Sequence, residues 1–209
     1  MVESREHNQL KDIALIWLLN QGCFLVDKEV PLSQIGLIRY TNLDMRTVID
    51  ALGVGMRHST LNGHTEGSDD FDPSELNGVE AGECTLRGVE VKVTRSDFHA
   101  GFACSGCNYH YLLTPLRLLS PWEVPKGIGL IEYNKHKFTC EYDEKLLDRP
   151  YKFDGLRVVK HATYRQIPRF IIDCAIANIA RRNLNLTRRR IVDEVMQGSS
   201  SPPLVKLNT

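Results

Sequence analysis

The sequence has no net charge, no long hydrophobic run and no phosphate-binding glycine loop. Its 26 basic residues balance its 26 acidic residues, so overall charge gives no argument for a nucleic-acid partner. No apolar run approaches the roughly 18–20 residues that a membrane span needs. Neither a G-x-x-x-x-G-K-S/T loop nor a G-x-G-x-x-G turn occurs, which argues against an ATP-driven or dinucleotide-dependent enzyme. The first six residues are polar and acidic, so we expect no secretory signal and a cytoplasmic location.

The chain also lacks internal repeats, and its 209 residues suit one domain with an extension. A mean hydropathy of -0.26 is ordinary for a globular protein. Six cysteines in a chain of this size favour reduced thiols over a disulfide scaffold. We predict one folded unit over residues 1–160 with a loop insertion at about 57–83. A helical extension over 161–197 is expected to pack on this unit, and residues 198–209 to form a flexible tail.

Apolar periodicity predicts two helices and six strands. Residues 6–20 and 168–182 each place four apolar side chains at i, i+3, i+4 and i+7, as in helices with one buried face. Strands are expected at 23–26, 47–54, 84–94, 109–114, 128–133 and 156–160, the last as a short edge strand. This order predicts an α/β fold with a central mixed sheet flanked by helices.

Charge is unevenly distributed along the chain. Residues 59–86 hold seven acidic residues and no Lys or Arg, whereas residues 157–190 hold nine basic residues and one acid. The basic segment is compatible with a face that follows a nucleic-acid backbone. A solvated helix end, where cations suit the helix dipole, explains the same arginines.

The residues with the clearest chemistry lie in two consecutive predicted strands. Asp50 interrupts an apolar strand, and Glu90 and Lys92 follow in the next strand, where they alternate with valines. Because adjacent strands lie about 4.8 Å apart, Asp50 and Glu90 on one face could share one Mg²⁺ through oxygen ligands. The Lys92 ammonium could then stabilise a hydroxide nucleophile or the charge that develops on a phosphate. A solvated strand face is the simpler alternative, since Glu-x-Lys triplets are common.

Residues 88–98 read GVEVKVTRSDF, and this string resembles the E-V-K-x-S/T-R-x-D-F signature of the MmcB-like group in the PD-(D/E)XK nuclease superfamily. The order of elements is similar over roughly residues 8–160, including Val-Pro at 30–31 and the I-G-L-I strand at 128–131. The resemblance implies a restriction-endonuclease-like core within the 1–160 unit. It also implies a Mg²⁺-dependent deoxyribonuclease, with Mn²⁺ as a substitute metal, in DNA repair, recombination or mobile-element biology.

Carried over by position, the resemblance makes Asp50 and Glu90 metal ligands and Lys92 the catalytic lysine. Many superfamily members add a glutamate from the first helix, for which Glu6 is the nearest candidate. Arg95 would contact a DNA phosphate, or would cap the following helix together with Asp97. The long gap before Glu90 leaves rivals to Asp50 among the preceding acids, which are Asp44, Asp69, Asp70 and Asp72. DNA is the expected partner, with a homodimer as an option and no membrane.

Two further functions stay open. One is a non-catalytic DNA-binding module on the same fold, because several members of the superfamily have lost catalysis. The other is a zinc-stabilised interaction domain built on His99, Cys104, Cys107 and His110. Zinc is disfavoured because these ligands are crowded into one loop, unlike the separated pairs of structural zinc modules.

Overall fold

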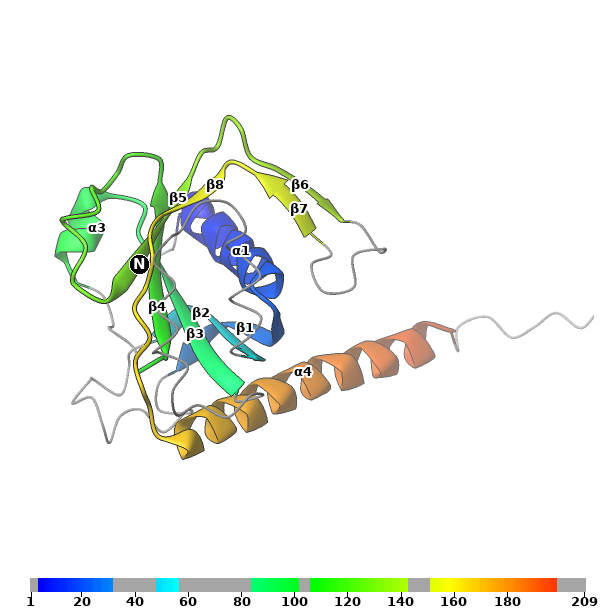
Figure 1. Cartoon of the computed structure of the whole chain (residues 1–209). Helices are drawn as coiled ribbons and strands as arrows, with labels where there is room; N and C mark the ends of the chain where they lie inside the picture. The colour runs from blue at the N-terminus through cyan, green and yellow to red at the C-terminus, as the bar shows by residue number, and fades with distance from the viewer. Residues whose placement is uncertain (1–3, 32–47, 57–83, 102–105, 143–150, 199–209) are drawn as a thin grey trace, which may run out of the picture.

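The computed structural model describes residues 4–31, 48–56, 84–101, 106–142 and 151–198. The elements of the main body are α1 (Arg5–Asn20), β1 (Cys23–Pro31), β2 (Val48–Met56), β3 (Cys84–Val91), α3 (Arg95–His99), β4 (Tyr109–Pro115), β5 (Ile128–Tyr133) and β8 (Leu156–Lys160). A hairpin of β6 (Thr139–Tyr142) and β7 (Tyr151–Asp154) and the long helix α4 (Arg169–Gly198) complete the described chain (Figure 1).

Six strands form one mixed sheet in the order β1-β2-β3-β4-β5-β8. The β3–β4 and β4–β5 pairs are parallel, and the other three pairs are antiparallel. The chain therefore has the α/β fold with a central mixed sheet that the sequence predicts. The prediction of 156–160 as an edge strand is confirmed, because β8 ends the order.

The two predicted helices cover the sheet (Figure 1). The apolar stripe of α1 is buried against the β3 valines and against residues of β4 and β5. The first half of α4 closes a second cluster with β1, β2 and the start of β3. A third cluster joins Leu112 and Leu130 of the sheet to the connection between β4 and β5. The predicted core positions Leu10, Ile13 and Ala14 are all buried.

Helix α4 is longer than the periodicity predicts. The apolar stripe ends near Arg182, but the sequence contains no Gly or Pro until Gly198, so nothing stops the helix earlier. Figure 1 shows the second half of α4 running past the strands. Exposed apolar side chains occur in that half, including Leu184 and Leu186.

Strand β1 extends beyond the predicted 23–26 because its charged residues find partners on the helices. Asp27 pairs with Arg182 of α4 at 2.9 Å, and Lys28 pairs with Asp12 of α1 at 2.7 Å. The β6–β7 hairpin escaped prediction because both strands are only four residues long and β6 is exposed along its whole length. No helix in the described ranges is long and apolar enough to span a membrane. The predicted insertion at 57–83 and residues 199–209 lie outside the described residues.

Candidate functional site

A shared kink in β1 and β2 determines where Asp50 points. Glu29 adopts a left-handed backbone conformation with φ 54°, and β1 changes face there, since Val26 packs in the cluster under α1 and Val30 in the cluster under α4. In β2, Ile49 packs in the cluster under α4 while Ala51 packs in the cluster under α1. A regular strand would place both side chains on one face. The strand therefore changes phase at Asp50, and the Asp50 side chain turns toward α1.

Asp50 is buried and has three polar neighbours. Its Oδ2 accepts a hydrogen bond of 2.8 Å from the backbone N–H of Val91. Its Oδ1 lies 3.2 Å from Nζ of Lys11 on α1, and Oδ2 lies 3.6 Å from Nε2 of His7 on the same helix. Lys11 also reaches Glu29 at 3.3 Å. The kink thus brings two carboxylates to one buried lysine.

The backbone pairing between β2 and β3 gives way to side-chain bonds at this point. Paired residues run from Met56 with Cys84 to Ala51 with Val89. Beyond that pair, the Val91 N–H donates to the Asp50 side chain, and the backbone of Asp50 lies near enough to the Glu90 carboxyl group to oppose the rise in its pKa. Asp50 of β2 therefore lies next to β3, close to Glu90, at the point where the backbone pairing of the two strands ends.

Glu90 is buried, and the pKa of its carboxyl group is strongly raised. It is 7% exposed, and burial, followed by the nearby charge of Asp50, raises its pKa to about 8 against the opposing effect of Lys92. Its Oε2 is buried and has no hydrogen-bond partner in the described part of the chain. Burial therefore favours the protonated form of Glu90 over its charged form.

Lys92 lies between two acids. Its Nζ is 3.7 Å from Oε1 of Glu90 and 3.5 Å from Oδ1 of Asp97. Asp97 in turn accepts a hydrogen bond from the Val93 N–H at 3.3 Å, and Thr94 caps the helix that contains it. The carboxylate of Asp97 therefore gives the lysine ammonium a second acidic neighbour.

Glu90 and Lys92 do not lie on a solvated strand face, which was the simpler alternative to a metal site. Both are 7% exposed, because β3 is the third of six strands and its second face is also covered. The predicted alternation itself is confirmed, since Val89 and Val91 are buried in the α1 cluster and Val93 packs against it. A solvated strand face therefore does not explain these two charged residues.

Arg95 and Glu6 lie apart from these carboxylates. Arg95 makes a bidentate ion pair with Glu123, with N–O distances of 2.7 and 3.3 Å, and its side chain is 53% exposed. Glu6 is exposed near the start of α1, and the pKa of the Tyr133 hydroxyl is raised by burial first and by the charge of Glu6 second. Neither residue takes part in the ion pairs of Asp50, Glu90 or Lys92 that the structure describes.

The remaining predicted ligands are only partly described. The rival acids Asp44, Asp69, Asp70 and Asp72 lie outside the described residues, as does Cys104 of the zinc hypothesis. Cys107 is buried in the cluster under α4. His110 is buried in β4, and this burial lowers its pKa to about 4.

Sequence reasoning missed His7, Lys11 and Asp97. His7 and Lys11 are spaced i, i+4 and flank the apolar stripe of α1 next to Leu10 and Ala14. That spacing puts both on one side of the helix, but only the kink at Asp50 reveals what they face. Asp97 had been considered as a helix cap alone.

Asp50 and Glu90 do not lie on one strand face as predicted, because Asp50 turns toward α1 whereas Glu90 alternates with the β3 valines that pack against α1. The two carboxyl groups approach each other where the β2–β3 pairing ends, close enough for the Asp50 charge to act on Glu90, and together they are the candidate ligands of a divalent metal. Both are oxygen donors, and Mg²⁺ commonly binds through one or two carboxylates while it keeps several waters. The buried Glu90 Oε2 without a partner is the kind of atom that such an ion would satisfy. Within the described ranges, no group of three or more His, Cys, Asp or Glu side chains is placed to hold a metal.

Comparisons with known proteins leave the family open. No protein-family model matches the chain, and no curated protein matches it. Among solved structures, the chain is similar to the SPO1766 protein of unknown function from Silicibacter pomeroyi. That match has 13% sequence identity and a TM-score of 0.41, and it covers 87% of this chain and 84% of the other.

Proposed function

We propose that this chain is a Mg²⁺-dependent deoxyribonuclease that hydrolyses phosphodiester bonds at the Asp50, Glu90 and Lys92 site. The observation that carries the proposal is the buried Glu90 carboxyl group, whose Oε2 has no partner among the described residues and whose pKa is raised to about 8 beside Asp50. A buried carboxyl pair of this kind is costly unless a cation completes it. Perturbed carboxyl groups of this kind also concentrate at functional sites.

Asp50 and Glu90 would hold the metal, and the metal would polarise the scissile phosphate and lower the pKa of a bound water. Lys92 would stabilise the negative charge that develops on the phosphate in the transition state. Asp97 would act as a positioning residue, because its carboxylate lies 3.5 Å from the lysine ammonium. Mn²⁺ would substitute for Mg²⁺, since it also accepts oxygen ligands.

DNA as the substrate rests on the resemblance of residues 88–98 to the MmcB-like signature. The exposed arginines of α4 are compatible with an anionic polymer, because Arg188, Arg189 and Arg190 place three positive charges in one exposed turn of the helix. A pathway in DNA repair, recombination or mobile-element biology remains part of the same proposal.

One observation favours a second function, a non-catalytic DNA-binding module on the same fold. Nζ of Lys11 already lies 3.2 Å from Asp50, where it supplies positive charge to that carboxylate. If this ammonium takes the place of a metal, the fold is kept and hydrolysis is lost. The two functions therefore differ in whether Asp50 accepts a divalent ion beside Lys11.

The test is DNA cleavage by the purified chain and by Glu90→Gln and Asp50→Asn, in Mg²⁺, in Mn²⁺ and in EDTA. Single-stranded, duplex and branched substrates should all be offered. The proposal expects metal-dependent cleavage by the wild type alone, with all three proteins folded. A wild type that binds DNA and never cuts it would establish the binding module instead.

A further inference from the structure

The connection between β4 and β5 presents an exposed aromatic ring. The side chain of Trp122 is 84% exposed, whereas the second tryptophan, Trp17, is 4% exposed in the α1 cluster. Tryptophan is strongly buried on average. An exposed indole loses the large favourable free energy that burial of its apolar surface would give. The position of this ring therefore needs an explanation.

The backbone beneath Trp122 is fixed from several sides. Glu123 accepts a 2.7 Å hydrogen bond from the Ser120 N–H and returns its own N–H to the Ser120 carbonyl at 2.9 Å. Lys160 of β8 donates to the carbonyl oxygens of Val124 at 2.6 Å and Pro125 at 3.0 Å. The ring is thus carried by a turn whose backbone is already ordered. The backbone therefore loses little conformational entropy when a ligand binds the ring.

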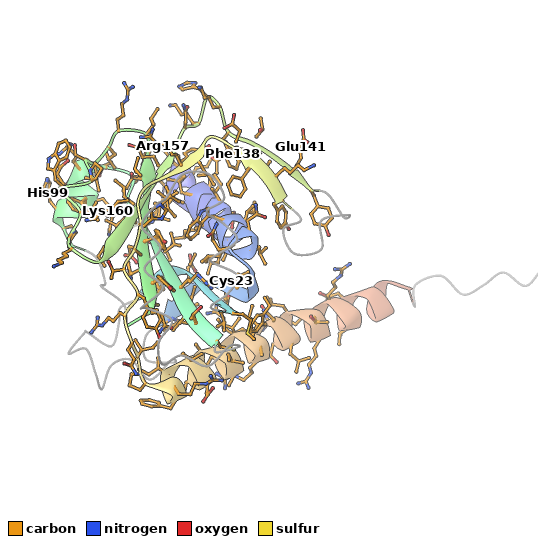
Figure 2. All side chains as sticks on the ribbon, in the orientation of Figure 1. Cys23, His99, Phe138, Glu141, Arg157 and Lys160 are labelled. Atoms are coloured by element: carbon orange, nitrogen blue, oxygen red, sulfur yellow. The ribbon has the colours of Figure 1, made fainter. Side chains whose placement is uncertain are left out.

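The same turn is tied to the candidate active site. Glu123, the residue after Trp122, holds Arg95 in a bidentate pair. Arg95 begins the five-residue helix α3 that also carries Asp97, the partner of Lys92. Figure 2 shows His99 of α3 and Lys160 on the same side of the molecule. Helix α3 thus connects the turn that carries Trp122, through Arg95, to Lys92, through Asp97.

The surroundings of Trp122 suit an anionic ligand with a flat ring. Arg117 and Lys126 of the same connection are exposed, and Arg95 remains half exposed despite its pair with Glu123. A protein-docking surface would need a contiguous apolar patch of several hundred Å². The connection exposes Leu116, Pro121 and Trp122, with the exposed cations Arg117 and Lys126 interspersed in the sequence. Aromatic rings in a positively charged surface are typical of proteins that bind single-stranded nucleic acid.

We propose that Trp122 is a stacking platform for an unpaired base of the DNA substrate. The inference rests on the proposed nuclease function and narrows its substrate to DNA with a single-stranded segment next to the scissile bond. Arg95 and Lys126 contact the backbone phosphates on either side of the stacked base. Duplex DNA without unpaired bases lacks an accessible base face for this ring.

The experiment measures binding of oligo(dT) and of a blunt duplex of equal length by fluorescence anisotropy in EDTA, which prevents cutting. Tryptophan emission is followed in the same samples. Emission of Trp122 should be quenched by oligo(dT), while the buried Trp17 gives the unquenched remainder. Trp122→Ala should weaken single-strand binding on the order of tenfold, as removal of one base–aromatic stack does. Trp122→Tyr should keep most of the wild-type affinity for single-stranded DNA, because a tyrosine ring can also stack on a base.

Leu116→Ala is the matched control, because Leu116 is an exposed apolar side chain of the same connection. It should bind oligo(dT) like the wild type. Unchanged oligo(dT) affinity in Trp122→Ala, with unquenched emission in the wild type, would overturn the inference and leave the proposed nuclease standing. Absence of any DNA binding or cleavage by the wild type would instead remove both. A change in self-association in Trp122→Ala, with DNA affinity intact, would assign the ring to a dimer contact and also overturn the inference.

Discussion

The ammonium of Lys11 lies 3.2 Å from Oδ1 of Asp50, and both side chains are buried. A charged pair removed from water is stable only while both partners are present. Because Asp50 is also a proposed metal ligand, a divalent cation bound there would act on the same carboxylate as the lysine. This relationship gives the first prediction.

Lys11→Met should lower the free energy of unfolding of the metal-free protein by on the order of 3 kcal/mol, because it leaves Asp50 and Glu29 without their shared cation. Mg²⁺ should recover part of this loss, since it can neutralise Asp50 in place of the ammonium. Urea unfolding with EDTA or with Mg²⁺ measures both effects.

Lys28→Met is the control for that measurement. Lys28 also pairs with an acid of α1, Asp12, but both side chains are about half exposed. Its loss should cost less than about 1 kcal/mol, with no dependence on Mg²⁺. Equal behaviour of the two lysine variants would show that Lys11 has no special relation to a metal site.

The raised pKa of Glu90 predicts how stability changes with pH. The folded chain keeps the Glu90 proton up to about pH 8, whereas the ordinary value for an unfolded chain is 4.5. The folded state therefore binds more protons between these values, so the free energy of unfolding should fall as the pH rises through this interval. Glu90→Gln should flatten that decline. Urea unfolding in EDTA at pH 5, 6, 7 and 8 measures it.

Glu132→Gln provides the comparison, because Glu132 is an equally buried strand glutamate that pairs with Arg157. In Glu132→Gln the free energy of unfolding should still fall as the pH rises from 5 to 8, since Glu90 remains in place. A wild-type protein whose stability does not fall between pH 5 and 8 would contradict the assignment of a protonated Glu90.

Lys92→Ala separates catalysis from binding. Cleavage should be abolished, because the lysine acts on charge that appears only in the transition state. DNA affinity should fall modestly, with the salt dependence reduced by about one phosphate contact. Gel assays of cleavage and anisotropy titrations at several salt concentrations measure the two effects.

Lys126→Ala, an exposed lysine of the β4–β5 connection, should show the reverse pattern. It should weaken binding to a similar extent and retain cleavage at saturating protein. If Lys92→Ala cuts DNA at the wild-type rate, the lysine has no part in the reaction.

Much of the fold could be predicted from the sequence because its signals are local. The stripe of Leu10, Ile13 and Ala14 predicts a buried helix face. The alternation of Val89 and Val91 predicts which face of β3 is apolar and is therefore covered. Both predictions are confirmed. Periodicity is a property of neighbouring residues, so a sequence shows it directly.

The arrangement of the candidate site depends on tertiary structure and could be predicted only in part. Asp50, Glu90 and Lys92 were identified by residue type and strand position. The kink at Glu29 and Asp50, however, follows from pairing between distant segments. The role of Lys11 depends on that kink. The burial of Glu90 and Lys92 depends on what covers the second face of the sheet, which alternation in one strand does not indicate.

The most direct test of the account is an anomalous difference map from a crystal soaked in Mn²⁺. The account predicts one strong peak held by the carboxylates of Asp50 and Glu90, with the Lys92 ammonium alongside and the peak absent from crystals of Glu90→Gln. A map with no peak at these carboxylates in soaked wild-type crystals, and Lys11 still paired with Asp50, would contradict the central claim that this pair of acids is a metal site.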